Sequence, residues 1–162
     1  MNDYPDLFLK VIKVVLKSEG GYSNDASDAG GETNFGISSR SYPAIDIKNL
    51  TIGQAIDIYY NDYWTPMNIG GILDDNLVLQ VFDMGVNSGI RIAIKILQRL
   101  IRVDDDGFVG NMTLQAVREF NGDIVIEFVK RRKLFYIALV QNDSNQRPNL
   151  KGWLARCDNT HF

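Results

Sequence analysis

The chain has 162 residues, of which 45% are hydrophobic and 23% charged, a balance that fits one globular domain or two closely joined lobes and excludes a fibrous or disordered protein. Its formal net charge of -3 gives no overall basic field, which argues against nucleic acid or an anionic membrane as the partner. The single cysteine, Cys157, excludes an internal disulfide framework and a multi-cysteine zinc site.

The N-terminal segment predicts an amphipathic helix over residues 6–18. Its apolar residues recur at helical spacing, with lysines on the opposite face: Leu7, Phe8, Val11, Ile12, Val15 and Leu16. The lysines interrupt the apolar run, so the segment does not have the pattern of a signal peptide. No stretch of the chain approaches the roughly 20 apolar residues that a membrane span needs. Gly20 and Gly21 are expected to end the helix, which places Glu19 at its last turn.

The next segment, residues 20–38, is rich in Gly, Asn, Asp and Ser and carries no helical period. Its second half, from Gly30 to Ile37, suits a short irregular β-hairpin. This hairpin is the only sheet that the sequence predicts.

The rest of the chain predicts helices separated by short breaks. Thr51 and Gln54 have the spacing of a capping box, and Pro66 is expected to stop the helix that they begin. Further helices are expected over residues 75–86, 90–103, 111–120 and 123–141. A polar loop with Pro148 is expected next, followed by a short final helix near Trp153. The basic run from Lys130 to Lys133 is expected to be a solvated helix face. The predicted fold class is therefore all-α, with a small loop and β-hairpin insertion after the first helix.

Glu19 is the candidate for acid catalysis. Glycoside hydrolysis needs a protonated carboxylic acid that donates to the leaving oxygen, usually opposed by a second group that activates water or stabilises the cation. The negative end of the helix dipole and partial burial both favour the protonated form of a carboxyl group at a helix C-terminus.

Candidates for the second group follow in the loop and the hairpin. The loop supplies Asp25 and Asp28, and the hairpin would fold Thr33 back toward the same space, so that a carboxylate and a hydroxyl could flank a water. Glycines in this region would let a bulky sugar approach the backbone. The same pattern also fits a plain helix end and turn, in which the aspartates would be capping residues.

The segment from Glu19 to Ile37 closely resembles the signature of glycoside hydrolase family 108, the N-acetylmuramidases also called secretion activator proteins. The positions that resemble the family pattern are Glu19, Gly20, Gly21, Tyr22, Asn24, Asp25, Asp28, Gly30, Gly31, Thr33, Gly36 and Ile37. Ala26 departs from the proline that is usual in the family, which loosens the loop but removes no reactive group.

The resemblance continues along most of the chain. The aromatic segment from Tyr59 to Trp64 is similar to one in the family, as are Asp83 to Gly89, the helix at Ala93 to Gln98, and the Asp106 to Gly110 loop. The later part resembles a predicted peptidoglycan-binding domain. This implies a catalytic lobe over residues 1–89 and a C-terminal helical lobe over residues 90–162, packed into one compact unit.

The resemblance implies a lysozyme-like helical fold and hydrolysis of the β-1,4 bond between N-acetylmuramic acid and N-acetylglucosamine in bacterial peptidoglycan, without a cofactor. Glu19 falls on the catalytic glutamate of the family. Asp28 and Thr33 are similar to the aspartate and threonine of phage lysozymes, with the threonine off by one residue. They are the predicted catalytic partners of Glu19.

Four residues are predicted to bind substrate. Tyr22, beside the acid, is expected in the cleft, where its ring can face a sugar, and Asn24 belongs to the family signature. Asp83 and Asn87 lie one helical turn apart and face the same way. They either line the cleft or form an internal hydrogen-bonded pair where two helices meet.

The run Asp104-Asp105-Asp106-Gly107 superficially resembles a calcium loop. If Gly107 took the sixth loop position, Arg102 and Thr113 would stand at the first and twelfth, where carboxylates are required. The run is therefore interpreted as a turn between helices, and no metal site is predicted.

Two other functions remain open. A lytic transglycosylase needs only one acid and makes a 1,6-anhydro product, while a peptidoglycan-binding or secretion-accessory module would keep the fold without turnover. The sequence predicts synthesis in the bacterial cytoplasm without a signal peptide and action on the cell wall after release by a holin-like or other route. It leaves open a role in phage lysis, wall remodelling or protein secretion, and the oligomeric state.

Overall fold

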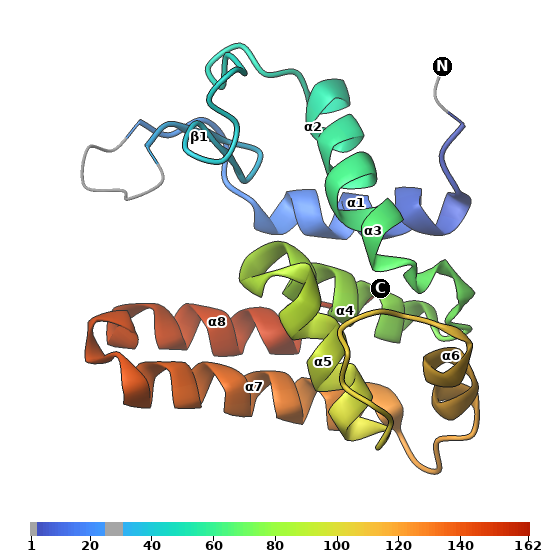
Figure 1. Ribbon diagram of the computed structural model, residues 1–162. Coiled ribbons are helices and arrows are strands. Elements are labelled where there is room, and N and C mark those ends of the chain that lie inside the picture. The colour runs from blue at the N-terminus through green and yellow to red at the C-terminus, as the bar shows by residue number, and fades with distance from the viewer. Residues whose placement is uncertain (1–2, 25–30) are drawn as a thin grey trace. The chain divides into compact units, whose positions relative to one another are not determined.

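The computed structural model describes residues 3–24 and 31–162 (Figure 1). The chain divides into two compact units, Met1–Asp62 and Tyr63–Phe162. Within the described residues, helices are the main regular structure of both units, and the only strands form one short hairpin in the first unit. The predicted all-α class with a hairpin insertion is therefore confirmed. None of the described helices is long and apolar enough to cross a membrane.

The first unit begins with helix α1, Asp6–Ser18, as the apolar periodicity predicts. The helix ends because the backbone of Glu19 is extended (φ -85°, ψ 141°), while its N–H still donates to the carbonyl oxygen of Val15. Gly20 and Gly21 follow this C-cap as expected. Neither of them adopts a left-handed backbone, so the termination does not depend on their conformational freedom.

The hairpin consists of β1, Thr33–Asn34, and β2, Ile37–Ser38, which pair antiparallel with Asn34 opposite Ile37. Phe35 and Gly36 form its two-residue turn, and both have positive φ (51° and 77°), the pattern of a type I′ turn. The buried side chain of Asn34 donates to the carbonyl oxygen of Ile47 over 3.1 Å and so holds the hairpin to the loop that follows.

Helix α2, Ile52–Tyr59, carries the capping box that the sequence predicts at Thr51 and Gln54. The chain continues through a π-helical turn, Tyr60–Trp64, into the short helix α3, Thr65–Met67. The prediction that Pro66 stops the helix is wrong, because Pro66 lies in the first turn of α3, where no backbone N–H is needed. The helical path ends instead at Asn68, which is left-handed (φ 52°).

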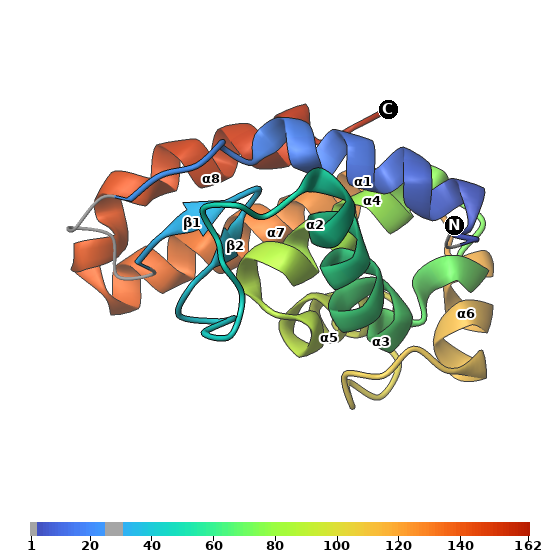
Figure 2. The same cartoon turned by 90° about the horizontal axis from the view of Figure 1, so that it is seen from above.

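The second unit is built around helix α4, Asp75–Ser88, whose residues from Leu77 to Gly85 are all buried. The other helices of this unit are α5 (Ile90–Leu100), α6 (Asn111–Arg118), α7 (Ile124–Asn142) and α8 (Arg147–Asn159). Helix α4 packs against α5 and α7, and α7 packs against α8, as Figures 1 and 2 show. Helix α8 is longer than predicted because Pro148 lies in its first turn instead of in a loop.

A buried polar network joins α4 to α7 and α8. The Asp83 carboxylate accepts hydrogen bonds from Arg132 of α7 and from Arg156 of α8, the latter at 2.6 Å. Gln80 donates to the carbonyl oxygens of Cys157 and Thr160 and accepts from Arg132. The prediction that the Lys130 to Lys133 run is a solvated face is therefore wrong for Arg132, which is fully buried.

The loop after α5 is organised by the buried side chain of Gln98. Its amide donates to the Asp106 carboxylate over 2.8 Å and accepts from the N–H of Gly107 over 2.8 Å. The hydrogen bond from Gln98 lowers the pKa of Asp106, and Arg99 lowers that of Asp105 in the same way. Both carboxylates thus have partners within the loop and the preceding helix.

Candidate active site

Glu19 lies directly against the hairpin turn. A methyl group placed on the Cα of Gly36 would lie 2.7 Å from the Glu19 Oε2 atom and 2.6 Å from the Tyr59 hydroxyl. The carboxyl end of Glu19 and the hydroxyl of Tyr59 therefore meet at the same point on the hairpin. Only a glycine leaves room for both, and its positive φ suits glycine as well.

Tyr59 connects helix α2 to this point. Its ring is buried, and its hydroxyl donates to the carbonyl oxygen of Phe35 over 2.9 Å. The ring of Tyr59 belongs to the core of the first unit. The hydroxyl beside Glu19 was missed, although a buried tyrosine hydroxyl must find a polar partner.

Tyr22 lies on the exposed segment after Glu19. Its hydroxyl donates to the Glu32 carboxylate over 2.6 Å, while 43% of its surface stays accessible. The hydrogen bond to Glu32 raises the pKa of Tyr22, and the side chain of Asn24 acts in the opposite direction. The phenol is therefore neutral and held in place, with its ring available for contact.

This grouping brings together two predicted substrate-binding residues, Tyr22 and Asn24, and adds Glu32. Sequence reasoning missed Glu32 because it is not among the positions that resemble the family signature. The available signal was the position of Glu32. It directly precedes Thr33 of the hairpin, and Ser23, which pairs with Thr33, directly follows Tyr22.

Thr33 is tied by its backbone to the segment after Glu19. Its N–H donates to the Ser23 carbonyl oxygen over 2.9 Å, and the Ser23 N–H donates back over 2.8 Å. The hairpin thus returns toward the helix end, as expected. A catalytic role of the Thr33 hydroxyl remains a prediction, and Asp28, its predicted companion, lies outside the described residues.

Asp83 has a structural role in place of the predicted substrate contact. Its side chain is 1% exposed, and both carboxylate oxygens accept hydrogen bonds from arginines, so neither is available to a sugar. Asp83 instead makes an internal contact between helices, the alternative that the sequence left open, and its partners are Arg132 and Arg156. Asn87 is exposed, and its amide donates to the Asp83 backbone oxygen over 2.7 Å, so its contact with substrate stays a prediction.

The local arrangement can supply acid chemistry. A half-buried carboxyl group at a helix end is fixed against a rigid hairpin turn, and an exposed aromatic ring stands a few residues away. Among the residues that the structure describes, no group of three or more His, Cys, Asp or Glu side chains is placed to hold a metal ion.

Comparison with known proteins gives two family matches. The glycosyl hydrolase 108 family matches residues 12–89, and the predicted peptidoglycan domain matches residues 92–158. Among solved structures, the chain is similar to SagA of Brucella abortus, with 31% sequence identity and a TM-score of 0.80, over 94% of this chain and 90% of that chain. No curated protein matches the chain. These findings confirm the resemblance identified from the signature around Glu19.

Proposed function

Since this chain belongs to the glycosyl hydrolase 108 family, we propose that it is an N-acetylmuramidase that cleaves peptidoglycan. The family matches support a peptidoglycan glycoside hydrolase with an all-α, lysozyme-like fold. The finer assignment places the cut at the β-1,4 bond that links N-acetylmuramic acid to N-acetylglucosamine. The observation that carries the proposal is the position of Glu19, at the end of α1 and against the hairpin turn.

In the proposed reaction, protonated Glu19 donates its proton to the glycosidic oxygen. The bond between that oxygen and C1 of N-acetylmuramic acid breaks, and N-acetylglucosamine leaves with a free 4-hydroxyl group. A water adds to C1 and loses a proton, which gives a reducing end. Asp28 and Thr33 are the proposed groups that position this water or stabilise the oxocarbenium-like transition state.

The hairpin turn supports this role of Glu19. The Glu19 carboxyl group and the Tyr59 hydroxyl both lie at the space that a Cβ on Gly36 would occupy, which restricts the positions of the carboxyl group. A catalytic acid held in one geometry loses little entropy when the substrate binds. Tyr22 is the proposed platform for a sugar ring, because its hydroxyl is fixed by Glu32 while its ring is exposed.

The direct test is the substitution Glu19→Gln, which keeps the shape of the side chain and removes its ionisable proton. We expect purified variant protein to lose lysis of bacterial sacculi by at least about a hundredfold, the lower end of what a general acid contributes. The melting temperature should stay close to that of the parent chain. Sacculus turbidity and circular dichroism measure the two effects.

Asp104→Asn is the matched control. It makes the same change from carboxylate to amide at an exposed position in the second unit, and it should lyse sacculi at the parent rate. Lysis by Glu19→Gln at the rate of Asp104→Asn would refute Glu19 as the acid. Binding of sacculi without lysis by the parent chain would indicate a non-catalytic module instead.

A further inference from the structure

A cavity of about 710 Å³ lies in the second unit, far along the chain from Glu19. It is formed by the end of α5, the connection from α6 to α7, and the first half of α7. Leu100 and Ile101 provide a buried apolar base, and Phe120 adds a half-buried ring. Arg102, Glu127 and Arg131 bring charge to the same space.

The two arginines of this cavity are available to a ligand. Among the residues that the structure describes, neither the Arg102 nor the Arg131 side chain has a hydrogen-bond or ion-pair partner, whereas Arg91 and Arg99 donate hydrogen bonds to the loop after α5. Arg102 also has a left-handed backbone (φ 59°), which is uncommon for a residue with a side chain. A guanidinium group binds a carboxylate through two parallel hydrogen bonds.

Acidic side chains stand beside these arginines. Glu119, Asp123 and Glu127 all line the cavity. Asp123 accepts from the Ile126 N–H as the cap of α7, and Glu127 accepts from Lys130 over 2.6 Å. A polyphosphate chain would meet these carboxylates at close range and be repelled. A ligand that carries both carboxylates and an ammonium group would have a partner for each charge.

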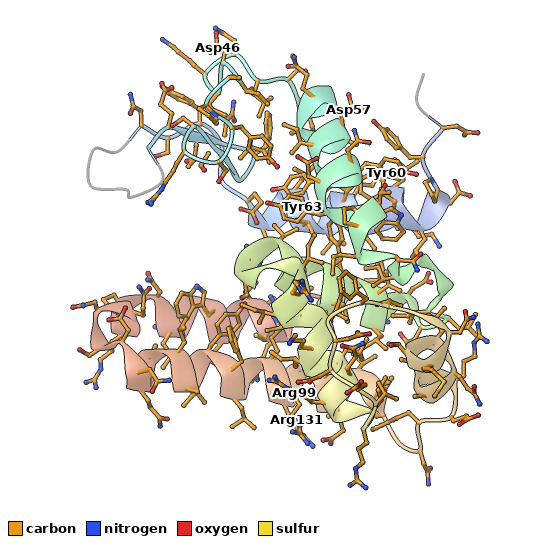
Figure 3. All side chains as sticks on the ribbon, in the orientation of Figure 1. Asp46, Asp57, Tyr60, Tyr63, Arg99 and Arg131 are labelled. Atoms are coloured by element: carbon orange, nitrogen blue, oxygen red, sulfur yellow. The ribbon has the colours of Figure 1, made fainter. Side chains whose placement is uncertain are left out.

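A second, smaller cavity of about 270 Å³ shares one lining residue with the first. Arg131 lines both, together with Arg99, Leu134 and Phe135 in the smaller one. Figure 3 labels Arg99 on α5 and Arg131 on α7. Leu134 is 59% exposed, so apolar surface continues beyond the charged part. The combined surface suits an extended ligand of several residues better than a single ion.

We propose that this surface, the stem-peptide site, binds the short peptides that hang from peptidoglycan glycan strands. Such peptides combine carboxylates, alanine methyl groups and, where they carry a diamino acid, a free ammonium group. Arg102 and Arg131 bind the carboxylates, Glu119 binds the ammonium group, and Phe120 contacts the methyl groups. The inference rests on the proposed function only in taking peptidoglycan as the substrate.

The test is calorimetric titration of the full chain with the tripeptide L-alanyl-γ-D-glutamyl-meso-diaminopimelate. We expect saturable binding by the parent protein. Arg131→Glu should weaken it by at least about tenfold, because a charge-assisted pair becomes a repulsive one. Arg131→Gln should weaken it less, and this milder variant decides the question if Arg131→Glu does not fold. Arg147→Glu is the control, since it reverses an exposed charge at the start of α8 outside the site.

The same variants are compared on two substrates. Arg131→Glu should cleave peptide-free glycan strands at the parent rate and show a raised KM on intact sacculi. No binding of the tripeptide by the parent protein, or equal binding by Arg131→Glu and Arg147→Glu, would overturn the proposal. Tripeptide binding by a parent protein that cleaves no glycan would refute the proposed function and leave the stem-peptide site standing.

Discussion

Gly36 is the residue on which the geometry of the candidate acid depends most closely. Its missing side chain lets the Glu19 carboxyl group and the Tyr59 hydroxyl approach the hairpin turn together. The atoms that a side chain at Gly36 would meet belong to the side chains of Glu19 and Tyr59 and not to the backbone. They would be displaced without disruption of the backbone, so the effect on activity should exceed the effect on folding.

The substitution Gly36→Ala tests this arrangement. We expect hydrolysis to fall by about a hundredfold, as for a catalytic group displaced by about 1 Å. Stability should fall by about 1–2 kcal/mol, because alanine disfavours the left-handed backbone. Turbidity assays and urea unfolding measure the two quantities. Gly152→Ala, in open space within α8, should leave hydrolysis intact, and an equal loss in both variants would contradict the role of Gly36.

At this scale, the sequence predicts the acid but not its surroundings. Glu19 follows from the helix end and the family signature, and its C-cap position agrees with both. Glu19 and Tyr59 converge on Gly36 from three segments that no local pattern connects. Asp83 shows the opposite error. The sequence pattern around a carboxylate on a helix is the same whether the carboxylate faces a substrate or arginines such as Arg132 and Arg156.

At the scale of elements, α4, α7 and α8 are joined by a buried ion-pair network. Among the described residues, Arg132 is the only arginine whose side chain is fully buried. Burial alone would lower the pKa of Arg132, but the nearby Asp83 carboxylate outweighs it, and the pKa is raised. The Arg132 guanidinium group therefore keeps its charge within the helix bundle.

Removing one partner of this network should destabilise the protein strongly. Asp83→Asn leaves Arg132 buried without its counter-charge, and we expect a loss of about 3–5 kcal/mol in the free energy of unfolding. Asp158→Asn is the control, because its ion pair with Lys133 is open to solvent on the Asp158 side and contributes at most about 1 kcal/mol. Urea unfolding of both variants gives the comparison, and similar midpoints would show that the network contributes little.

The helices themselves could be predicted from apolar periodicity and capping residues, as α1 and α2 illustrate. The errors occur at Pro66, which was expected to stop a helix, and at Pro148, which was expected in a loop. Both lie instead in the first turns of helices, α3 and α8. Proline is compatible with a loop and with the first turn of a helix, and the conformation of the preceding residues determines which of the two it occupies. No sequence pattern predicts a π-helical turn such as Tyr60–Trp64.

For the whole molecule, the family segments and the compact units do not coincide. The matches meet between residues 89 and 92, at the junction of α4 and α5, whereas the compact units meet at residues 62 and 63. Helix α4 thus belongs to the hydrolase match but packs among the helices of the predicted peptidoglycan domain.

This overlap predicts how fragments of the chain behave. A fragment of residues 90–162 lacks α4 and exposes the apolar faces of α5 and α7, so we expect it to be unfolded or aggregated. A fragment of residues 63–162 keeps α4 and should unfold cooperatively. Circular dichroism on heating distinguishes them, and a cooperative transition in the shorter fragment would show that α4 is dispensable.

The most direct measurement of the central claim is the chemistry of the new chain ends. Purified sacculi are digested, reduced with borohydride, and analysed by mass spectrometry. We predict that the parent chain releases muropeptides that end in reduced N-acetylmuramic acid, and that Glu19→Gln releases none above background. Ends in 1,6-anhydro sugar or in reduced N-acetylglucosamine, or equal release by Glu19→Gln, would contradict a muramidase whose acid is Glu19.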